Sequence, residues 1–285
     1  MNELQNEDVK IATSSIGENF TDESHLDTHY QMAKAEYDAC IEAVGIQSGW
    51  HVLDAGCGNG VFLRHLSQLA GRSGSVTAVD HAPEHIQKIE NLAKNSNYLS
   101  PIQARVSDIT KLPFEDNAFD CVWCANVSQY LLDSELDAAL AEFKRVVRPG
   151  GIVAIKEFDL SCWHYPPIDV RLFWRLYDAT AKANATQTLG TLRSSNMSRW
   201  LRKHGLDIKY RKTTFVERWA PVSGFEKQCS DMLCWLASSA QSVDLSEADK
   251  SEWRTIIETA DSIVRDPDFC SREFFTLTIG AKSLA

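Results

Sequence analysis

The chain has 285 residues, of which 44% are hydrophobic and 24% charged, and its formal net charge is −10 at pH 7. This composition is typical of a soluble globular protein with room for one domain and a cap. No apolar run approaches the roughly 18 residues that cross a membrane, so no membrane partner is expected. Residues 1–150 hold 11 Lys and Arg against 22 Asp and Glu, which argues against nucleic acid as a partner because phosphate binding requires a basic face.

The N-terminal residues and the cysteines both favour a cytoplasmic protein. The first thirty residues carry acidic side chains where a secretory signal would have basic and then apolar residues, so no leader is expected. Eight cysteines are scattered along the chain, and Cys121 and Cys124 form a C-x-x-C pair without a matching second pair. We therefore expect reduced structural thiols and no metal site.

Residues 1–20 are polar and aperiodic, which predicts a mobile tail before a single domain of residues 21–285. A helical pattern begins at Thr21 and stops at Gly45. Strand and helix signals then alternate, which indicates βαβ units and a parallel sheet. Strands are expected at His51–Asp54, Ser75–Asp80, Ile102–Val106, Phe119–Ala125 and Ile152–Phe158. Helices are expected at about Gly60–Ala70, Pro83–Asn95 and Ser134–Val147.

The alternation breaks after residue 159. Residues 160–190 contain Pro166–Pro167 and an aromatic-rich helix, and residues 223–263 predict two more helices. Between them, a helix is expected over Leu192–His204 and a strand at about Asp207–Glu217, and Glu273–Ala281 alternates like a closing strand.

The stretch VLDAGCGNGVF, Val52 to Phe62, predicts a ligand site at the carboxyl edge of the sheet. A glycine turn that enters a helix offers unpaired N–H groups to a carboxylate or phosphate. Gly56, Gly58 and Gly60 do not follow the Gly-x-Gly-x-x-Gly spacing that binds a pyrophosphate, and Asp54 stands two residues before them. Because a carboxylate repels an anion and attracts an ammonium group, we expect a zwitterionic ligand.

Two further strands are expected to end in aspartate at the same edge. Asp80 closes VTAVD, where a carboxylate can accept both hydroxyls of a ribose. Asp108, in VSDIT, can accept from the exocyclic amine of adenine. Three neighbouring strands that end in Asp favour a site for an adenosine ligand over solvated surface.

Four stretches carry a resemblance to a known family: VLDAGCGNGVF, VTAVD, SDITKLPFEDNAFDCVWCANVSQYL and EFKRVVRPGGIVAIKEFD. In this order they are similar to the motifs of class I S-adenosylmethionine (SAM)-dependent methyltransferases, over about residues 30–159. LPFEDNAFD and RVVRPGG are characteristic of the branch that acts on small molecules. The resemblance implies an α/β fold with a Rossmann-like seven-stranded sheet, helices on both faces, an N-terminal lid helix and a helical cap inserted in the C-terminal half. It implies SAM as the cofactor and S-adenosylhomocysteine as its product.

The resemblance also implies a division of the domain. Residues 21–159 would form the SAM-binding core, residues 160–190 and 220–263 the substrate cap, and residues 206–218 and 272–282 the closing strands.

Roles for single residues follow from the same resemblance. Gly56 and Gly58 would lie against the methionine and ribose of SAM, Asp54 near its ammonium group, and Asp80 on the ribose hydroxyls. His81 would flank adenine, although this position is more often apolar, and Asp108 and Ile109 would contact it. Asn126 would contact the methionine part through its backbone. Tyr30 would close over the cofactor, with an equal case for a plain core tyrosine.

Methyl transfer needs alignment and exclusion of water, because the thioether leaving group requires no acid. Candidates for contact with the acceptor follow the fourth and fifth strands: Ser128, Gln129, Tyr130, Glu157, Asp159, His164 and Tyr165. His164 is the best candidate for a general base because an unperturbed histidine titrates near neutrality, and Tyr130 and Glu157 are the other catalytic candidates.

The sequence also bears on the acceptor. NVSQY, Asn126 to Tyr130, differs from the Asn/Asp-Pro-Pro-Tyr/Phe of nucleic-acid N-methyltransferases. The six tryptophans after residue 160 indicate either an aromatic pocket for an apolar or planar substrate or the core of the cap. The leading hypothesis is methylation at O, N or C of a small molecule, as in natural-product biosynthesis, by a monomer or homodimer. The alternative is a SAM-binding protein of this fold that does not methylate, either pericyclase-like or a pseudoenzyme.

Overall fold

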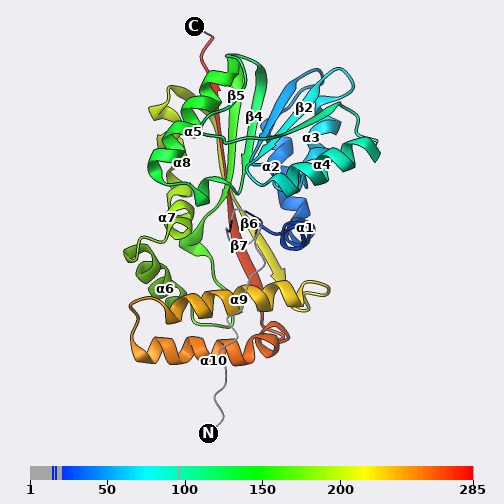
Figure 1. Cartoon of the computed structure of the whole chain (residues 1–285). Helices are drawn as coiled ribbons and strands as arrows, with labels where there is room; N and C mark the ends of the chain where they lie inside the picture. The colour runs from blue at the N-terminus through cyan, green and yellow to red at the C-terminus, as the bar shows by residue number, and fades with distance from the viewer. Residues whose placement is uncertain (1–14, 16, 18–20, 96, 285) are drawn as a thin grey trace.

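The computed structural model describes residues 15, 17, 21–95 and 97–284, so the predicted tail of residues 1–20 lies outside the described residues except for Ser15 and Gly17. One seven-stranded sheet with the order β3-β2-β1-β4-β5-β7-β6 forms the centre of the molecule (Figure 1). The strands are β1 (His51–Ala55), β2 (Ser75–Asp80), β3 (Ile102–Val106), β4 (Phe119–Ala125), β5 (Val147–Phe158), β6 (Leu206–Trp219) and β7 (Cys270–Lys282).

The first five strands are parallel, and β7 runs antiparallel between β5 and β6. In β1, Val52 to Ala55 are buried on both faces, as expected of a central strand in a parallel sheet. The reversal of strand order beside β1 places a crevice at the carboxyl ends of β1 and β4, where open α/β sheets bind ligands. The predicted seven-stranded Rossmann-like sheet is thus confirmed.

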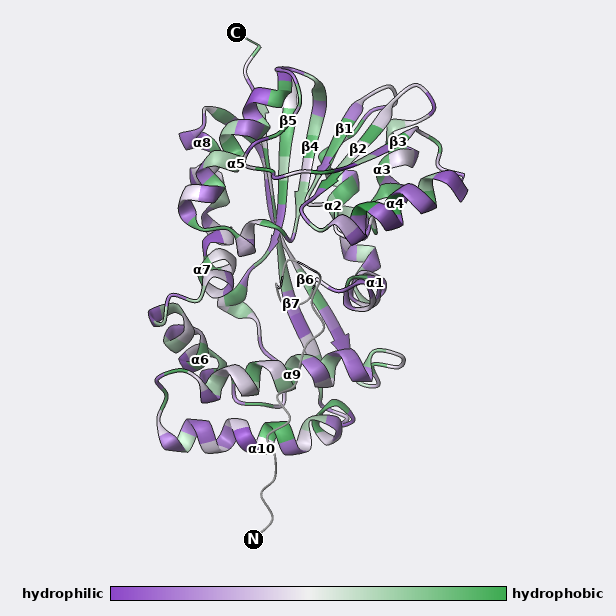
Figure 2. Cartoon of the chain, in the orientation of Figure 1, coloured by the Kyte–Doolittle hydropathy of each residue, from purple (hydrophilic) through white to green (hydrophobic). Residues whose placement is uncertain are grey.

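Helices cover both faces of the sheet, with apolar stripes turned toward it (Figure 2). One face packs against α2 (Lys34–Val44), α3 (Leu63–Ala70) and α4 (Pro83–Asn95), and buries Trp123. The other packs against α5 (Asp133–Val146) and α8 (Met197–Lys203), and buries Leu53. Glu135 stabilises the start of α5 by accepting from the Leu132 N–H at 2.7 Å. Helices α3, α4 and α5 agree with the predicted ones to within a few residues.

The single leading helix expected from Thr21 to Gly45 is two helices, α1 (Glu23–Met32) and α2. The break is at Ala33, whose φ of −112° and ψ of 22° leave the helical region. Asp22 begins α1 by accepting from the His25 N–H at 3.1 Å. The break lets α1 turn away from α2 and lie over the glycine loop, so the predicted lid is a separate helix.

The expected helix over Leu192–His204 is also interrupted. It comprises the end of α7 (Thr186–Arg193), a 3₁₀ turn η3 (Ser194–Asn196) and then α8. The Ser194 and Ser195 hydroxyls donate to the carbonyls of Thr191 and Leu192, at 2.7 and 3.3 Å. Such side-chain bonds compete with the helical backbone and explain the tighter turn.

A second hydrophobic core lies away from the sheet, at the far end of the long strands β6 and β7 (Figure 1). It is built from α6 (Val170–Lys182), α9 (Glu226–Gln241) and α10 (Glu247–Val264). Two short 3₁₀ turns, η1 (Ser128–Tyr130) and η2 (Leu160–Cys162), follow β4 and β5, and η2 leads from the sheet toward α6. The structure has the expected helical cap; its separation as a substrate-binding unit stays a prediction.

Among the described residues, no helix combines the length and the apolar character needed to cross a membrane.

Candidate functional site

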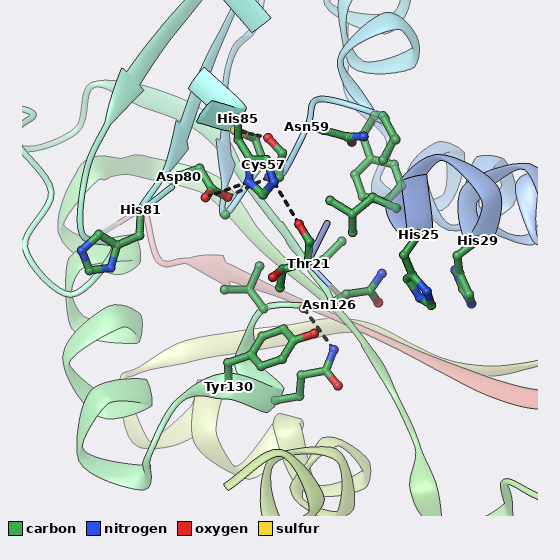
Figure 3. A pocket seen from close by; sticks show the side chains of 18 of the residues that line it. Thr21, His25, His29, Cys57, Asn59, Asp80, His81, His85, Asn126 and Tyr130 are labelled. Atoms are coloured by element: carbon green, nitrogen blue, oxygen red, sulfur yellow. Dashed lines mark hydrogen bonds and ion pairs between the residues drawn. The ribbon is translucent and has the colours of Figure 1, made fainter. Parts of the chain in front are cut away.

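A cavity of about 670 Å³ opens at the carboxyl ends of the parallel strands (Figure 3). Its floor is the glycine loop after β1, with Asp80 at the end of β2 and Asn126 in the turn after β4 beside it. Helix α1 closes one side through His25 and His29, and α9 contributes Met232. The cavity therefore lies between the sheet, the lid helix and the cap.

The glycine loop has a backbone that other residues do not readily adopt. Gly56 and Gly58 have φ values of 77° and 51°, in the region that favours glycine. A Cβ on Gly56 would lie 2.3 Å from Cγ2 of Val127, and one on Gly58 would lie 3.1 Å from Leu26 of the lid. Gly60 has another task, because a Cβ there would meet Ile89 and Leu63 at 2.9 Å. The first two glycines line the cavity, and the third allows helix packing.

Asp54 is buried beneath this loop, and neither of its carboxyl oxygens has a hydrogen-bond partner. Burial and the nearby Asp80 raise the pKa of Asp54 to about 8. A buried carboxyl group without a partner is unfavourable unless a donor or cation compensates it. The ammonium group of a zwitterion is both a hydrogen-bond donor and a cation. The buried carboxyl group of Asp54 therefore fits the methionine end of SAM.

Asp80 lies at the end of β2 and lines the cavity. Its carboxylate accepts from the N–H groups of Gly58 and Ala82 at 2.8 and 2.9 Å. His85 Nδ1 lies 3.3 Å from the same carboxylate, and its Nε2 lies 3.0 Å from the Thr21 carbonyl (Figure 3). Because both neighbours are acceptors, the imidazole donates from both nitrogens. Although burial opposes this charge, the hydrogen bond and the charge of Asp80 raise the pKa of His85.

His85 is not among the site residues predicted from the sequence. The signal available was its position in the first turn of α4, five residues after Asp80.

The residues predicted to contact adenine lie together at the outer end of the cavity. His81, Asp108 and Ile109 all line it, and His81 is exposed. Partial burial opposes ionisation of Asp108, but hydrogen bonds from the Thr110 hydroxyl and N–H lower its pKa. Tyr30 lines the cavity from the lid and donates to Asp38 at 3.2 Å. The structure brings all these predicted residues together, and their roles stay predictions.

At the inner end, a chain of polar side chains follows the cavity wall. Glu273 Oε2 lies 2.9 Å from His29 Nε2, and His29 Nδ1 lies 3.1 Å from the Tyr37 hydroxyl. Asn126 Nδ2 donates to that hydroxyl at 2.7 Å, and its Oδ1 accepts from Lys156 at 2.5 Å. These side chains come from α1, α2, β7, β5 and the turn after β4. Of the residues in this polar chain, only Asn126 was predicted as a site residue from the sequence, because no local pattern relates the other positions.

Lys156 is fully buried beneath this chain. Its Nζ lies 3.2 Å from the centroid of the Phe275 ring and 4.0 Å from that of Phe158. Burial lowers the pKa of Lys156, while the carboxylate of Glu157 opposes this. The aromatic faces favour the ammonium form over the neutral amine.

The three catalytic candidates have different positions. Tyr130 lines the cavity from η1. Glu157 is buried and accepts from Ser128 Oγ and the Gln129 N–H, at 2.9 and 3.0 Å, so it holds the η1 turn in place. This geometry does not test whether Tyr130 or Glu157 takes part in catalysis.

His164 does not line the cavity. Its Nδ1 lies 2.8 Å from the Cys162 carbonyl and its Nε2 lies 3.2 Å from Arg272 Nη1. The guanidinium only donates and the carbonyl only accepts, so both imidazole nitrogens are engaged by the protein. His164 thus contacts Arg272 of β7 and is not among the residues that line the cavity, and its role as a general base stays a prediction.

The remaining aromatic candidates divide between the two expected locations. Trp163 stacks on Phe158 with ring centroids 5.8 Å apart, and both line the cavity. Tyr165 and Phe173 are buried in the second core, and Trp219 is 55% exposed. Among the described residues, no group of three or more His, Cys, Asp or Glu side chains is arranged to hold a metal ion.

The strand order and the glycine loop after β1 define the Rossmann-like fold of class I methyltransferases. Residues 52–151 match a family model described as a methyltransferase domain. Residues 52–151 thus form a methyltransferase domain, which agrees with the predicted class I SAM-dependent family and its cofactor.

Two curated relatives illustrate the similarity. The ubiquinone/menaquinone biosynthesis C-methyltransferase UbiE of Hahella chejuensis is 32% identical over 152 residues, which are 48% of this chain and 60% of the relative. The malonyl-[acyl-carrier protein] O-methyltransferase of Salmonella typhimurium is 32% identical over 162 residues, 57% of this chain and 59% of the relative. The chain thus spans about three fifths of the length of each.

Solved structures extend the similarity to the whole fold. The [4+2]-cyclase SpnF is 19% identical and matches with a TM-score of 0.55 over 90% of this chain and 83% of its own. A SAM-dependent methyltransferase of Methanosarcina mazei is 16% identical and has a TM-score of 0.55 over 86% of this chain and 98% of its own. At these identities the similarity concerns the fold.

Proposed function

We propose that this protein transfers a methyl group from SAM to a small molecule bound between the lid helix α1 and the cap. One observation carries the proposal: the carboxyl group of Asp54 is buried without a partner beneath the glycine loop, and that loop and Asp80 of the next strand line the cavity. This pair of carboxyl groups suits an ammonium group at one point and ribose hydroxyls at another.

Each group in the cavity has a defined task in this reaction. Asp54 and the glycine loop would hold the methionine part, Asp80 the ribose, and Asp108 with Ile109 the adenine. The bound cofactor supplies an electrophilic methyl group. The protein orients the acceptor and excludes water, which α1 does by closing over the cavity.

The inner end of the cavity supports an apolar or planar acceptor. Phe158, Trp163 and Met232 line it there, and His29, Tyr37 and Glu273 provide the polar contacts. A mostly apolar wall with few fixed polar groups is typical of a small-molecule site. The names of the two curated relatives concern quinone biosynthesis and malonyl-[acyl-carrier protein], and their different acceptors leave the acceptor atom open.

Isothermal titration calorimetry with SAM and S-adenosylhomocysteine tests the cofactor site. Asp80→Ala is expected to lower the affinity for both by about tenfold or more, because a charged hydrogen-bond acceptor is worth about 1.5–3 kcal/mol. Asp178→Ala is the matched control, since Asp178 is exposed and pairs with Lys182 on α6. Equal affinities in wild type and Asp80→Ala would contradict the site.

Transfer of a labelled methyl group then separates the two function classes. For this purpose the protein is incubated with SAM and a broad metabolite extract. If it binds SAM and converts a compound of the extract without methylating any compound, the pericyclase-like alternative is favoured.

A further inference from the structure

The polar chain at the inner end of the cavity has a direction that its two ends fix independently. At one end, Lys156 Nζ donates to the amide oxygen of Asn126 at 2.5 Å. The Asn126 NH₂ group must then face the Tyr37 hydroxyl, to which it donates at 2.7 Å. The Tyr37 oxygen is an acceptor in this contact, and its own proton is directed elsewhere.

The other end gives the same direction. The carboxylate of Glu273 accepts, so the His29 proton in this contact lies on Nε2, 2.9 Å from Oε2. Nδ1 is then an acceptor, and the Tyr37 hydroxyl donates to it across 3.1 Å. The proton of Tyr37 thus points at an imidazole whose far side is held by a carboxylate, the arrangement that lets a hydroxyl group lose a proton.

This chain is enclosed but not separated from the cavity. Tyr37, Glu273 and His29 are 1%, 2% and 6% exposed, and all three line the cavity wall. The neighbouring His25 ring stacks on His29 with centroids 6.0 Å apart. Burial and His29 lower the pKa of His25 to about 3, so His25 stays neutral. Low polarity strengthens hydrogen bonds within such a chain.

We propose that Tyr37, His29 and Glu273 form a proton relay that removes a proton from the methyl acceptor, and that the acceptor is therefore a hydroxyl group or an acidic C–H. This proposal rests on the proposed function. Tyr37 is the residue that touches the acceptor, and His29 and Glu273 are positioning residues that act through it.

The relay conserves every proton and charge. The acceptor O–H or C–H bond breaks, and its proton joins the Tyr37 oxygen. The O–H bond that Tyr37 held breaks at the same time, and that proton joins His29 Nδ1. The acceptor keeps the electron pair that forms its bond to the methyl group, and the imidazolium pairs with the Glu273 carboxylate until it releases a proton to solvent. A neutral amine needs no such step before methylation.

The first test examines the ligand-free protein by nitrogen NMR of its histidine side chains, with His29 assigned from the spectrum of His29→Gln. We expect a neutral imidazole protonated at Nε2. Glu273→Gln should shift the tautomer balance, because an amide can donate as well as accept. Glu217→Gln on β6, which loses an ion pair with Arg272, is the matched control and should leave His29 unchanged. Protonation at Nδ1, or no change in Glu273→Gln, would overturn the relay.

The second test compares two acceptors that share a naphthalene ring, 2-naphthol and 2-naphthylmethylamine, at saturating SAM. We expect methylation of the naphthol, and a roughly 100-fold or greater fall in its kcat in Tyr37→Phe, the usual loss when proton transfer is removed. KM and the SAM affinity should stay within about twofold, because the phenylalanine ring keeps the packing. Glu273→Asp should recover part of the kcat that Glu273→Gln loses.

The outcomes separate the two proposals. Absence of SAM binding in calorimetry would refute the proposed function and leave the NMR result standing. With SAM bound, transfer to the amine alone, transfer to neither acceptor, or an unchanged kcat in Tyr37→Phe would overturn the relay and its acceptor class.

Discussion

The two ends of the cavity are built in different ways. The cofactor end is the end where we propose that SAM binds; its Asp54, Gly56 and Asp80 belong to two adjacent parallel strands and the loop after one of them. The acceptor end is the inner end, where we propose that the methyl acceptor binds; its His29 and Glu273 are 244 residues apart in the chain. The first end follows from the sheet alone, whereas the second exists only after the lid helix and the antiparallel strand β7 have both packed. We therefore expect substitutions at the cofactor end to change binding and stability, and those at the acceptor end to change turnover.

The largest expected effect concerns Asp54 and the pH dependence of stability. Its pKa of about 8 in the folded protein lies above the ordinary value of 3.8. Between these values the folded state holds a proton that the unfolded state has lost, so stability falls as pH rises, by at most about 1.4 kcal/mol per pH unit. Urea unfolding of the ligand-free protein at pH 5 and pH 8 should show this fall, and Asp54→Asn should flatten it.

In Asp54→Asn, the free energy of unfolding and the affinity for SAM should change in opposite directions. At pH 8, Asp54→Asn is expected to be more stable than wild type without ligand and to bind SAM more weakly. A variant that binds SAM as tightly as wild type would show that Asp54 does not face the ammonium group.

Gly56→Ala comes second in size. A side chain there meets Val127 at 2.3 Å and must also adopt a φ of 77°, so we expect a loss of roughly 2–4 kcal/mol in the free energy of unfolding and a SAM affinity at least about tenfold lower. Gly45→Ala is the matched control, since Gly45 has a φ of 75° and nothing within 4 Å of its Cβ position. Equal losses in both variants, measured by urea unfolding, would attribute the effect to φ alone.

The same contrast explains how far the sequence could lead. Parallel strands bring their carboxyl ends to one edge, so the positions of Asp80 and Asp108 followed from strand order, and the sheet and most helices were predicted correctly. The break at Ala33, which frees the lid helix, has no proline or glycine to indicate it. His29, Tyr37 and Glu273 come together only through tertiary packing, which no local spacing encodes.

His85 occupies an intermediate position, because it supports the cofactor end through a contact that the sequence did not reveal. His85→Ala removes one hydrogen bond to Asp80 and leaves those from Gly58 and Ala82. We expect SAM affinity to fall about tenfold, less than in Asp80→Ala, from the loss of about 1.5 kcal/mol. Calorimetry on the double variant should show less than the sum of the two single losses, because the residues share one interaction. Additive losses would mean that His85 acts on the ligand by another route.

The smallest expected effect is that of His164→Gln, and it tests the acceptor end by exclusion. His164 has the residue type of a general base, but Arg272 and the Cys162 carbonyl occupy its two nitrogens outside the cavity. The substitution should lower the free energy of unfolding by about 0.5–1.5 kcal/mol through these hydrogen bonds and leave kcat within about twofold. His29→Gln should lower kcat by about 100-fold, since it interrupts proton transfer, with the SAM affinity unchanged. A large fall in kcat in His164→Gln and none in His29→Gln would reverse the assignment and place the proton acceptor on η2 rather than on the lid.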